Sequence, residues 1–151
     1  MKPILYTVAA LCVLVYSTKV YRPSHVPWQY GVRAPSLAVP IPVFWGTASF
    51  ESSMRSDAIG TNGFDHGLFQ LYCVFDAYRM QRWGWFDPLN PMDSARIARK
   101  IYADNGRAFH STLYRVTAYR WGINGARRHG ADLWYYNHVM KEAKYFEGGK
   151  R

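Results

Sequence analysis

The chain has 151 residues, of which 49% are hydrophobic and 17% aromatic. This length is typical of one domain, and the composition supplies a packed core and excludes an intrinsically disordered protein. The formal net charge of +9 favours a polyanionic partner. No zinc-finger, homeodomain or RNP pattern accompanies that charge, so specific nucleic-acid recognition is not expected.

The first 18 residues are predicted to be a targeting segment. Lys2 gives a positive start, and the apolar run from Ile4 to Val15 is shorter than the roughly 20 residues of a membrane span but suits a signal peptide. No convincing cleavage site follows, so a signal peptide and an uncleaved signal anchor both stay open. Residues 19–41 are rich in proline, which predicts an extended tether.

A helix is predicted from Val43 to Met54, where apolar residues recur at helical spacing. Pro42 sits in its first turn, where helices tolerate proline. The glycines and asparagine between Asp57 and Asp65 predict a loop or a small hairpin. From His66 to Arg82 the apolar pattern resumes and predicts a second helix.

Three more helices are predicted in the second half of the chain, which makes the fold mainly α. The pairs Asp87-Pro88 and Asn90-Pro91 predict a loop, because a residue before proline avoids helical ψ. Asp93 is the expected N-cap of a helix that ends just before Gly106. The last two helices are expected at about residues 110–120 and 132–146.

The cysteines predict no disulfide within the folded domain. Cys12 lies in the apolar leader, and Cys73 stands alone in the body of the chain. A disulfide-stapled secreted scaffold is therefore excluded, and Cys73 is expected to be a small buried hydrophobic residue.

Glu51 is the candidate catalytic residue. Glutamate is scarce, and the other two, Glu142 and Glu147, lie in a charged C-terminal stretch that predicts a solvated face. Glu51 instead lies near the end of an apolar helix, where loss of hydration raises the pKa of a carboxyl group. Glycosidic bond cleavage needs such a protonated acid. Composition alone would still make Glu51 an exposed residue on a polar face, and the motifs around it favour catalysis.

Four motifs in order resemble those of the soluble lytic transglycosylases, enzymes that cut peptidoglycan strands. The apolar helix that ends in Glu51-Ser52 resembles the first motif. Gly67–Gln70 resembles the family's Gly-Leu-Met-Gln, and residues 87–105 resemble its Asp-Pro … Asn-Ile helix. Residues 118–130 resemble Ala-Tyr-Asn-x-Gly … Arg-Arg-Tyr-Gly. Each motif is weak alone, but their shared order and spacing is a strong signal.

Tyr135 stands where the family has the tyrosine of a Tyr-Val-x-x-Val helix, so the resemblance covers about residues 39–141. Two departures affect the fourth motif. Arg120 replaces the family's asparagine, and one extra residue separates Gly122 from the basic pair Arg127-Arg128. These departures concern substrate contacts and leave the acid unchanged.

The resemblance implies a lysozyme-like, mainly α domain over residues 42–147, with a small loop or hairpin region beside a cleft for a glycan strand. It implies cleavage of the β-1,4 bond between N-acetylmuramic acid and N-acetylglucosamine with formation of 1,6-anhydromuramic ends. Glu51 would be the catalytic acid, without a metal or cofactor. The expected substrate-binding residues are Ser52, Gln70, Tyr119 and Tyr135.

A hydrolytic mechanism is the first alternative. Asp65–Gln70 also resembles the Asp-x-Gly-Ile-Leu-Gln of animal-type lysozymes, in which the aspartate is the second catalytic carboxylate. If Asp65 lies about 5 Å from Glu51, it would act as nucleophile or ion stabiliser and water would be the final acceptor. The later motifs and the missing disulfides favour the transglycosylase.

A second alternative is a non-catalytic peptidoglycan-binding component of an envelope complex or a phage particle. Under either enzymatic reading the partner is a peptidoglycan glycan strand, with envelope-complex or virion proteins as further candidates. The membrane would be contacted only through the N-terminal segment. Export through that segment would place the protein in the periplasm or cell envelope, and a phage origin would place it in the virion.

Overall fold

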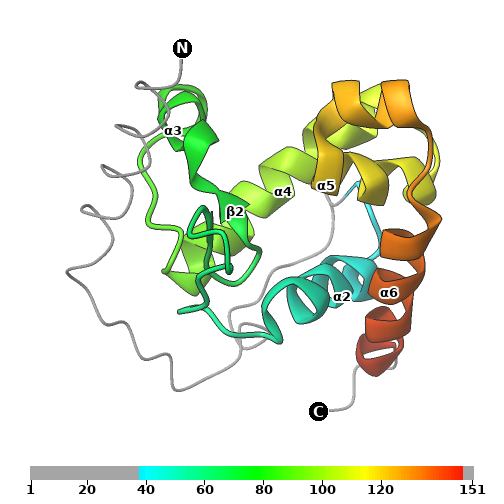
Figure 1. Cartoon of the computed structure of the whole chain (residues 1–151), viewed down its shortest axis with the longest axis horizontal. Helices are drawn as coiled ribbons and strands as arrows, with labels where there is room; N and C mark the ends of the chain where they lie inside the picture. Colours follow the sequence, from blue (N-terminus) through cyan, green and yellow to red (C-terminus); the bar gives the residue numbers. More distant parts are fainter. Residues whose placement is uncertain (1–37, 148–151) are drawn as a thin grey trace. The chain divides into compact units, whose positions relative to one another are not determined.

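The computed structural model describes residues 38–147, which form two compact units (Figure 1). The hairpin unit is Glu51–Ile97, and the helical unit contains residues 38–50 and 98–147. The described chain is mainly helical with a small two-stranded hairpin, which confirms the predicted mainly α class. The predicted targeting segment and residues 19–37 of the predicted tether lie outside the described residues. Among the described helices, none has the length and apolar character needed to cross a membrane.

Helix α2 (Ile41–Ser52) begins and ends close to the predicted bounds. The Pro40 carbonyl accepts the first helical bond from the Phe44 amide at 3.0 Å. Pro42 costs no hydrogen bond because the first N–H groups of a helix have no partner within the helix. The helix stops at Ser52 because Ser53 and Met54 both adopt positive φ, at 53° and 63°.

The hairpin unit contains two short strands where a helix was predicted. Strands β1 (Asp65–His66) and β2 (Leu71–Tyr72) pair antiparallel, and Ile59 forms an isolated bridge with His66. The helix predicted from His66 is therefore wrong in its first half. A 3₁₀ turn, η2 (Cys73–Phe75), and helix α3 (Asp76–Trp83) follow the hairpin. Within η2, Cys73 is buried and has no disulfide, as predicted.

Gly67 explains why no helix forms through this segment. Its φ is +77°, and a Cβ atom at this position would overlap the carbonyl oxygen of Pro88. Gln70 also has positive φ, at 47°. A right-handed helix cannot pass through two left-handed residues three positions apart, so the apolar residues of this stretch are buried by a hairpin instead.

Helix α4 (Pro91–Ala108) begins two residues before the predicted cap. Asn90 is the capping residue, since its Oδ1 accepts from the Met92 amide at 2.9 Å and from the Asp93 amide at 3.3 Å. Pro91 then occupies the first helical position. Gly106 was expected beyond the helix but lies inside it, and a larger residue at this position would collide with Ala38.

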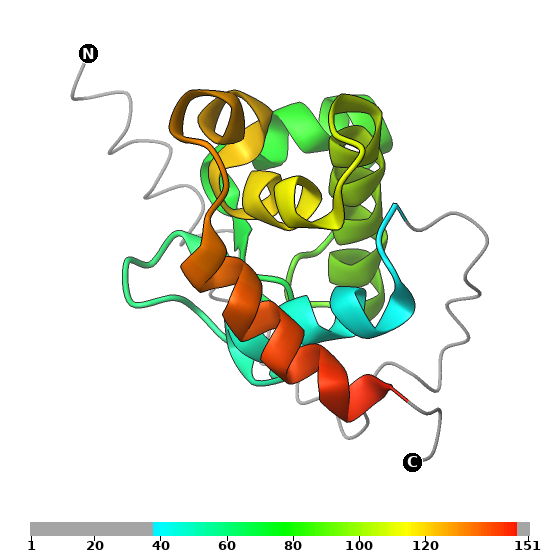
Figure 2. The same cartoon turned by 90° about the vertical axis from the view of Figure 1, so that its right-hand side faces the viewer.

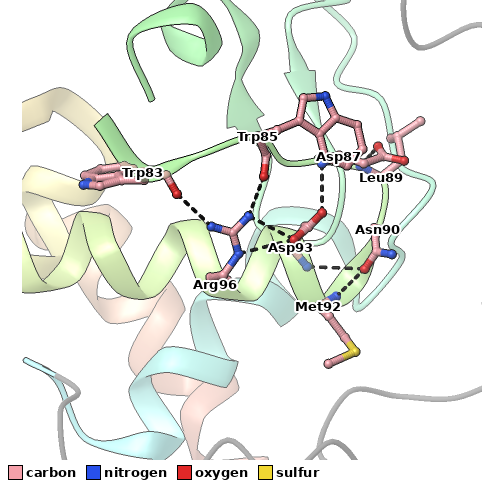
Figure 3. Close-up of polar contacts among 8 residues, drawn as sticks. All are labelled: Trp83, Trp85, Asp87, Leu89, Asn90, Met92, Asp93 and Arg96. Carbon is pink, nitrogen blue, oxygen red and sulfur yellow. Dashed lines mark hydrogen bonds and ion pairs between the residues drawn. The ribbon is translucent and has the colours of Figure 1, made fainter. Parts of the chain in front are cut away.

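Arg96 ties the start of α4 to the loop before it (Figure 3). Its guanidinium donates to the Trp83 carbonyl at 3.1 Å and to the Trp85 carbonyl at 2.9 Å, and it pairs with Asp93 at 3.0 Å. The other oxygen of Asp93 accepts from the backbone amide of Asp87 at 3.0 Å. One arginine fork thus holds both ends of the loop between α3 and α4.

Replacing Arg96 with lysine is expected to lower the free energy of unfolding by about 1–2 kcal/mol, because an ammonium group cannot keep three acceptors in a planar fork. Urea unfolding with an unchanged m-value measures this loss. Arg55→Lys is the matched control, since Arg55 pairs with Asp57 through largely exposed side chains and should change stability by less than about 0.5 kcal/mol. Equal losses for the two variants would contradict the role of the fork.

The helical unit is built around α2 and two later helices (Figure 2). Helix α5 (Thr112–His129) is interrupted at Gly122, whose φ of 73° and ψ of 164° are not helical. The predicted end near residue 120 is therefore correct, but a second helical stretch follows it. Helix α6 (Leu133–Ala143), extended by the 3₁₀ turn η3 (Lys144–Phe146), crosses α2 at Gly46.

Gly46 allows α2 and α6 to approach closely. A Cβ atom at Gly46 would lie 2.6 Å from the Val139 carbonyl oxygen and 2.7 Å from the Ala143 amide nitrogen. Tyr135, Val139 and Ala143 are buried at successive i, i+4 positions of α6, so one apolar stripe faces inward.

Candidate active site

Glu51 lies near the end of α2, as the sequence predicted, where it is the penultimate residue, and its side chain is half-buried. The next residue, Ser52, is buried and donates from its Oγ to the Leu68 carbonyl at 2.8 Å. The hydrogen bond joins the end of the helix to the Gly67–Gln70 turn, sixteen residues further along the chain. Ser52 therefore fixes the helix end that carries Glu51, and this contact uses its hydroxyl as a donor.

The Gly67–Gln70 turn is held on its other side by the segment before α4 and by the first turn of α4. Gly67 lies directly against the Pro88 carbonyl, and the Phe69 amide donates to Ser94 Oγ at 3.3 Å. Leu68 and Phe69 are fully buried. Three motif segments of the resemblance thus contact one another inside the hairpin unit.

Gln70 lies at the end of this turn and is half-buried. Its Nε2 donates to the carbonyls of Gly67 at 2.9 Å and Ala58 at 3.2 Å. Both contacts stabilise the hairpin. Within the described chain they leave the amide oxygen Oε1 as the atom of Gln70 that can accept a hydrogen bond from a ligand.

Asp65, the candidate second carboxylate, lies in β1 and is half-buried. Its Oδ2 accepts from Asn62 Nδ2 at 2.7 Å. Asn62 also accepts from the Phe64 amide at 2.9 Å, as an asparagine at a turn commonly does. Asp65 is thus a bonded member of the hairpin, and its carboxylate keeps further lone pairs available.

Tyr119 belongs to the helical unit, where its ring stacks on Tyr102 with 4.9 Å between centroids. Tyr102 is fully buried, and its hydroxyl forms a 2.7 Å hydrogen bond with Thr47 Oγ1. Tyr119 is half-buried beside it. A tyrosine held by a buried neighbour keeps one orientation, which suits a residue that positions a ligand.

Tyr135 is buried, with only 2% of its surface exposed. Its ring packs edge-on against Phe50 at 5.4 Å and lies under the guanidinium of Arg120 at 5.3 Å. Its backbone amide is capped by Asp132 Oδ1 at 2.9 Å. The side chain is therefore a packed part of the helical unit.

Arg120, which stands in place of the family's asparagine, forms an ion pair with Asp132 at 3.0 Å. Asp132 also accepts the Tyr135 amide, so one carboxylate both caps α6 and anchors the arginine. The Arg120 side chain is 41% exposed. Sequence reasoning identified the substitution but missed the pair, although the Asp132 cap position was a usable signal.

Glu142 was expected on a solvated face, and the structure corrects this. It is half-buried and accepts a hydrogen bond from Ser49 Oγ at 2.6 Å. The pair links α6 to α2, the two helices that meet at Gly46. Glu142 therefore has a structural role. In residues 38–147 no group of three His, Cys, Asp or Glu side chains is arranged to hold a metal ion.

Phe50 and Trp134 also escaped the sequence analysis. Phe50 directly precedes Glu51 in the chain, and its ring contacts Trp134, Tyr135 and His138 within 5.8 Å. Trp134 is 58% exposed. The sequence is rich in aromatic residues, and it does not indicate which of them are exposed, because exposure is set by the fold.

The chain was compared with models of protein families, with curated proteins and with solved structures, and none of them matches.

Proposed function

We propose that the chain is a peptidoglycan lytic transglycosylase with a lysozyme-like fold and Glu51 as its catalytic acid and base. One observation carries the proposal. The residue next to Glu51, Ser52, is hydrogen-bonded to the Gly-Leu-Phe-Gln turn, so two motifs that are distant in sequence contact each other. The third motif supports the same turn through Pro88 and Ser94.

In the proposed reaction Glu51 donates its proton to the glycosidic oxygen, and the bond from that oxygen to C1 of N-acetylmuramic acid breaks. The substrate's own N-acetyl oxygen stabilises the positive charge at C1. The Glu51 carboxylate then removes the proton from the muramic 6-hydroxyl, whose oxygen bonds to C1. Glu51 is protonated again, and no water is consumed.

The other residues are proposed to serve binding. Gln70 offers its Oε1 to a sugar hydroxyl or N-acetyl N–H group, since its Nε2 is committed to the hairpin. Ser52 positions the helix end, and Tyr119, which is half-buried, keeps the substrate-binding role that the resemblance implies. Tyr135 is buried, so its proposed role is to support Arg120 from within the helical unit. The net charge of +9 suits a polymer whose lactyl and peptide groups carry carboxylates.

The experiment that tests the proposal is mass spectrometry of the products released from purified peptidoglycan. Anhydro ends are lighter than reducing ends by one water, and we expect them to dominate. Absence of any released muropeptide under conditions in which the protein is folded would reject the enzymatic proposal. It would favour a non-catalytic peptidoglycan-binding component.

A hydrolase is the second candidate function, and the position of Asp65 in the hairpin supports it. Asp65 and Gln70 both approach Gly60, so the second carboxylate and the Gln70 acceptor lie on the same part of the hairpin. Reducing ends among the products, together with loss of activity in Asp65→Asn, would establish this mechanism over the transglycosylase.

A further inference from the structure

Trp134 is an exposed aromatic side chain that is nevertheless held in place. It lies in the first turn of α6, and 58% of its surface is accessible. The His138 ring packs against it with 4.2 Å between centroids, and the Phe50 ring meets it edge-on at 5.8 Å. His138 is itself fixed, because its Nδ1 donates to the Trp134 carbonyl at 2.7 Å.

Arg120 gives this aromatic surface a cationic, hydrogen-bonding border. Its guanidinium lies 5.4 Å from the centre of the indole and is anchored by Asp132, whose side chain is 9% exposed. The Arg120 side chain is 41% exposed, and an ion pair at one nitrogen leaves other N–H groups of the fork directed elsewhere. All five residues, Phe50, Arg120, Asp132, Trp134 and His138, belong to the helical unit.

From these contacts we infer that Trp134 is a stacking platform for one pyranose ring of the glycan strand, with Arg120 binding its polar substituents. This inference rests on the proposed function and names a subsite for its substrate. The faces of a β-linked hexopyranose carry C–H groups with partial positive charge, which complement the negative face of an indole. Its edge carries hydroxyl and N-acetyl groups, and muramic acid adds a carboxylate that a guanidinium binds strongly.

Two features favour a sugar ring over an apolar partner. A sugar ring presents an apolar face inside a polar rim, and the Trp134 surface has the same arrangement, with Arg120 and His138 around the indole. The indole is already held by its neighbours, so little side-chain entropy is lost when a ligand stacks on it. Phe50, which supports the indole, is also the residue before Glu51 in the chain.

The test is a titration of soluble, uncrosslinked glycan strands into the Glu51→Gln protein, which leaves the strands intact. Trp134→Ala in that background is expected to raise Kd at least about tenfold, as truncation of a central aromatic contact does. Trp134→Tyr should keep Kd within about threefold, because it retains an aromatic face. An unchanged Kd in Trp134→Ala would overturn the inference.

Trp85→Ala is the matched control. Trp85 is 72% exposed and lies in the hairpin unit, so its removal is expected to change Kd by less than about twofold if stacking is specific to Trp134. A loss equal to that of Trp134→Ala would contradict the inference. If Trp134→Ala does not fold, the indole N–H resonance of Trp134 in the parent protein decides. We expect it to shift during the titration, and a stationary resonance would reject the platform.

Failure of the subsite and failure of the proposed function give different results. Release of anhydro products together with an unchanged Kd in Trp134→Ala would retain the enzyme and reject the platform. If Trp134→Ala weakens glycan binding but the wild-type protein releases no muropeptide, the platform is retained and the enzymatic proposal is rejected.

Discussion

Glu51→Gln is expected to lower the release of muropeptides from purified cell walls by at least about 100-fold, because general acid catalysis typically contributes 10²–10⁴ to a rate. Glutamine has nearly the same shape as glutamate but has no carboxyl proton to donate to the leaving oxygen. The measurement is the initial rate of soluble product formation, followed by chromatography. Thermal unfolding should show that the variant is folded.

Glu147→Gln is the control for this experiment. Glu147 is exposed at the C-terminal end of the described chain, so we expect a rate within about twofold of the parent protein. Wild-type rates in Glu51→Gln would remove the central claim of the proposed mechanism. An equal decrease of the rate in both variants would show that the net charge of the protein, and not a specific acid, controls activity.

Gly67→Ala is expected to lower the free energy of unfolding by about 2–5 kcal/mol. Two costs add: alanine at φ +77° has a conformational penalty of about 1–2 kcal/mol, and its methyl group would force the Pro88 carbonyl to move, at about 1–3 kcal/mol. Urea unfolding measures the loss. Because the turn also bonds to Ser52, the rate of wall degradation should fall with it.

Gly63→Ala separates the two costs. Gly63 has nearly the same backbone conformation, φ +72°, but no atom lies within 4 Å of the position its Cβ would take. Only the conformational penalty applies, so the expected loss is about 1 kcal/mol. Similar losses at the two glycines would show that contact with Pro88 does not matter.

Local signals in the sequence predicted much of the fold. Proline in a first turn, a capping side chain and helical spacing act over a few residues, so the helix that carries Glu51, the last helix at 133–143 and the part of α5 before Gly122 were found close to their observed positions. The last helix was predicted to begin at about Asp132, which is the N-cap of α6, one residue before Leu133. The prediction of Asp93 as the N-cap was wrong, because Asn90, three residues earlier, accepts the hydrogen bonds from the first amides of the helix.

The segment after His66 shows where local reasoning ends. Its apolar spacing suits a helix, but Gly67 must lie against Pro88, twenty-one residues away, and this contact requires a left-handed backbone. Gly106 is the converse case. Its glycine type predicts a helix end, but it lies within α4, where Ala38 packs against it. Neither partner can be recognised from neighbouring residues.

The sequence by itself determined the mainly α class, the burial of Cys73 and the placement of Glu51 near the end of an apolar helix, since each depends on residues adjacent in the chain or on composition. Only the tertiary structure decided that Ser52 bonds to the Gly67–Gln70 turn, that Glu142 is tied to Ser49, and that Arg120 is anchored by Asp132. These contacts join residues 12 to 93 positions apart. Which residues meet over such separations is set by packing, and so is the exposure of Trp134.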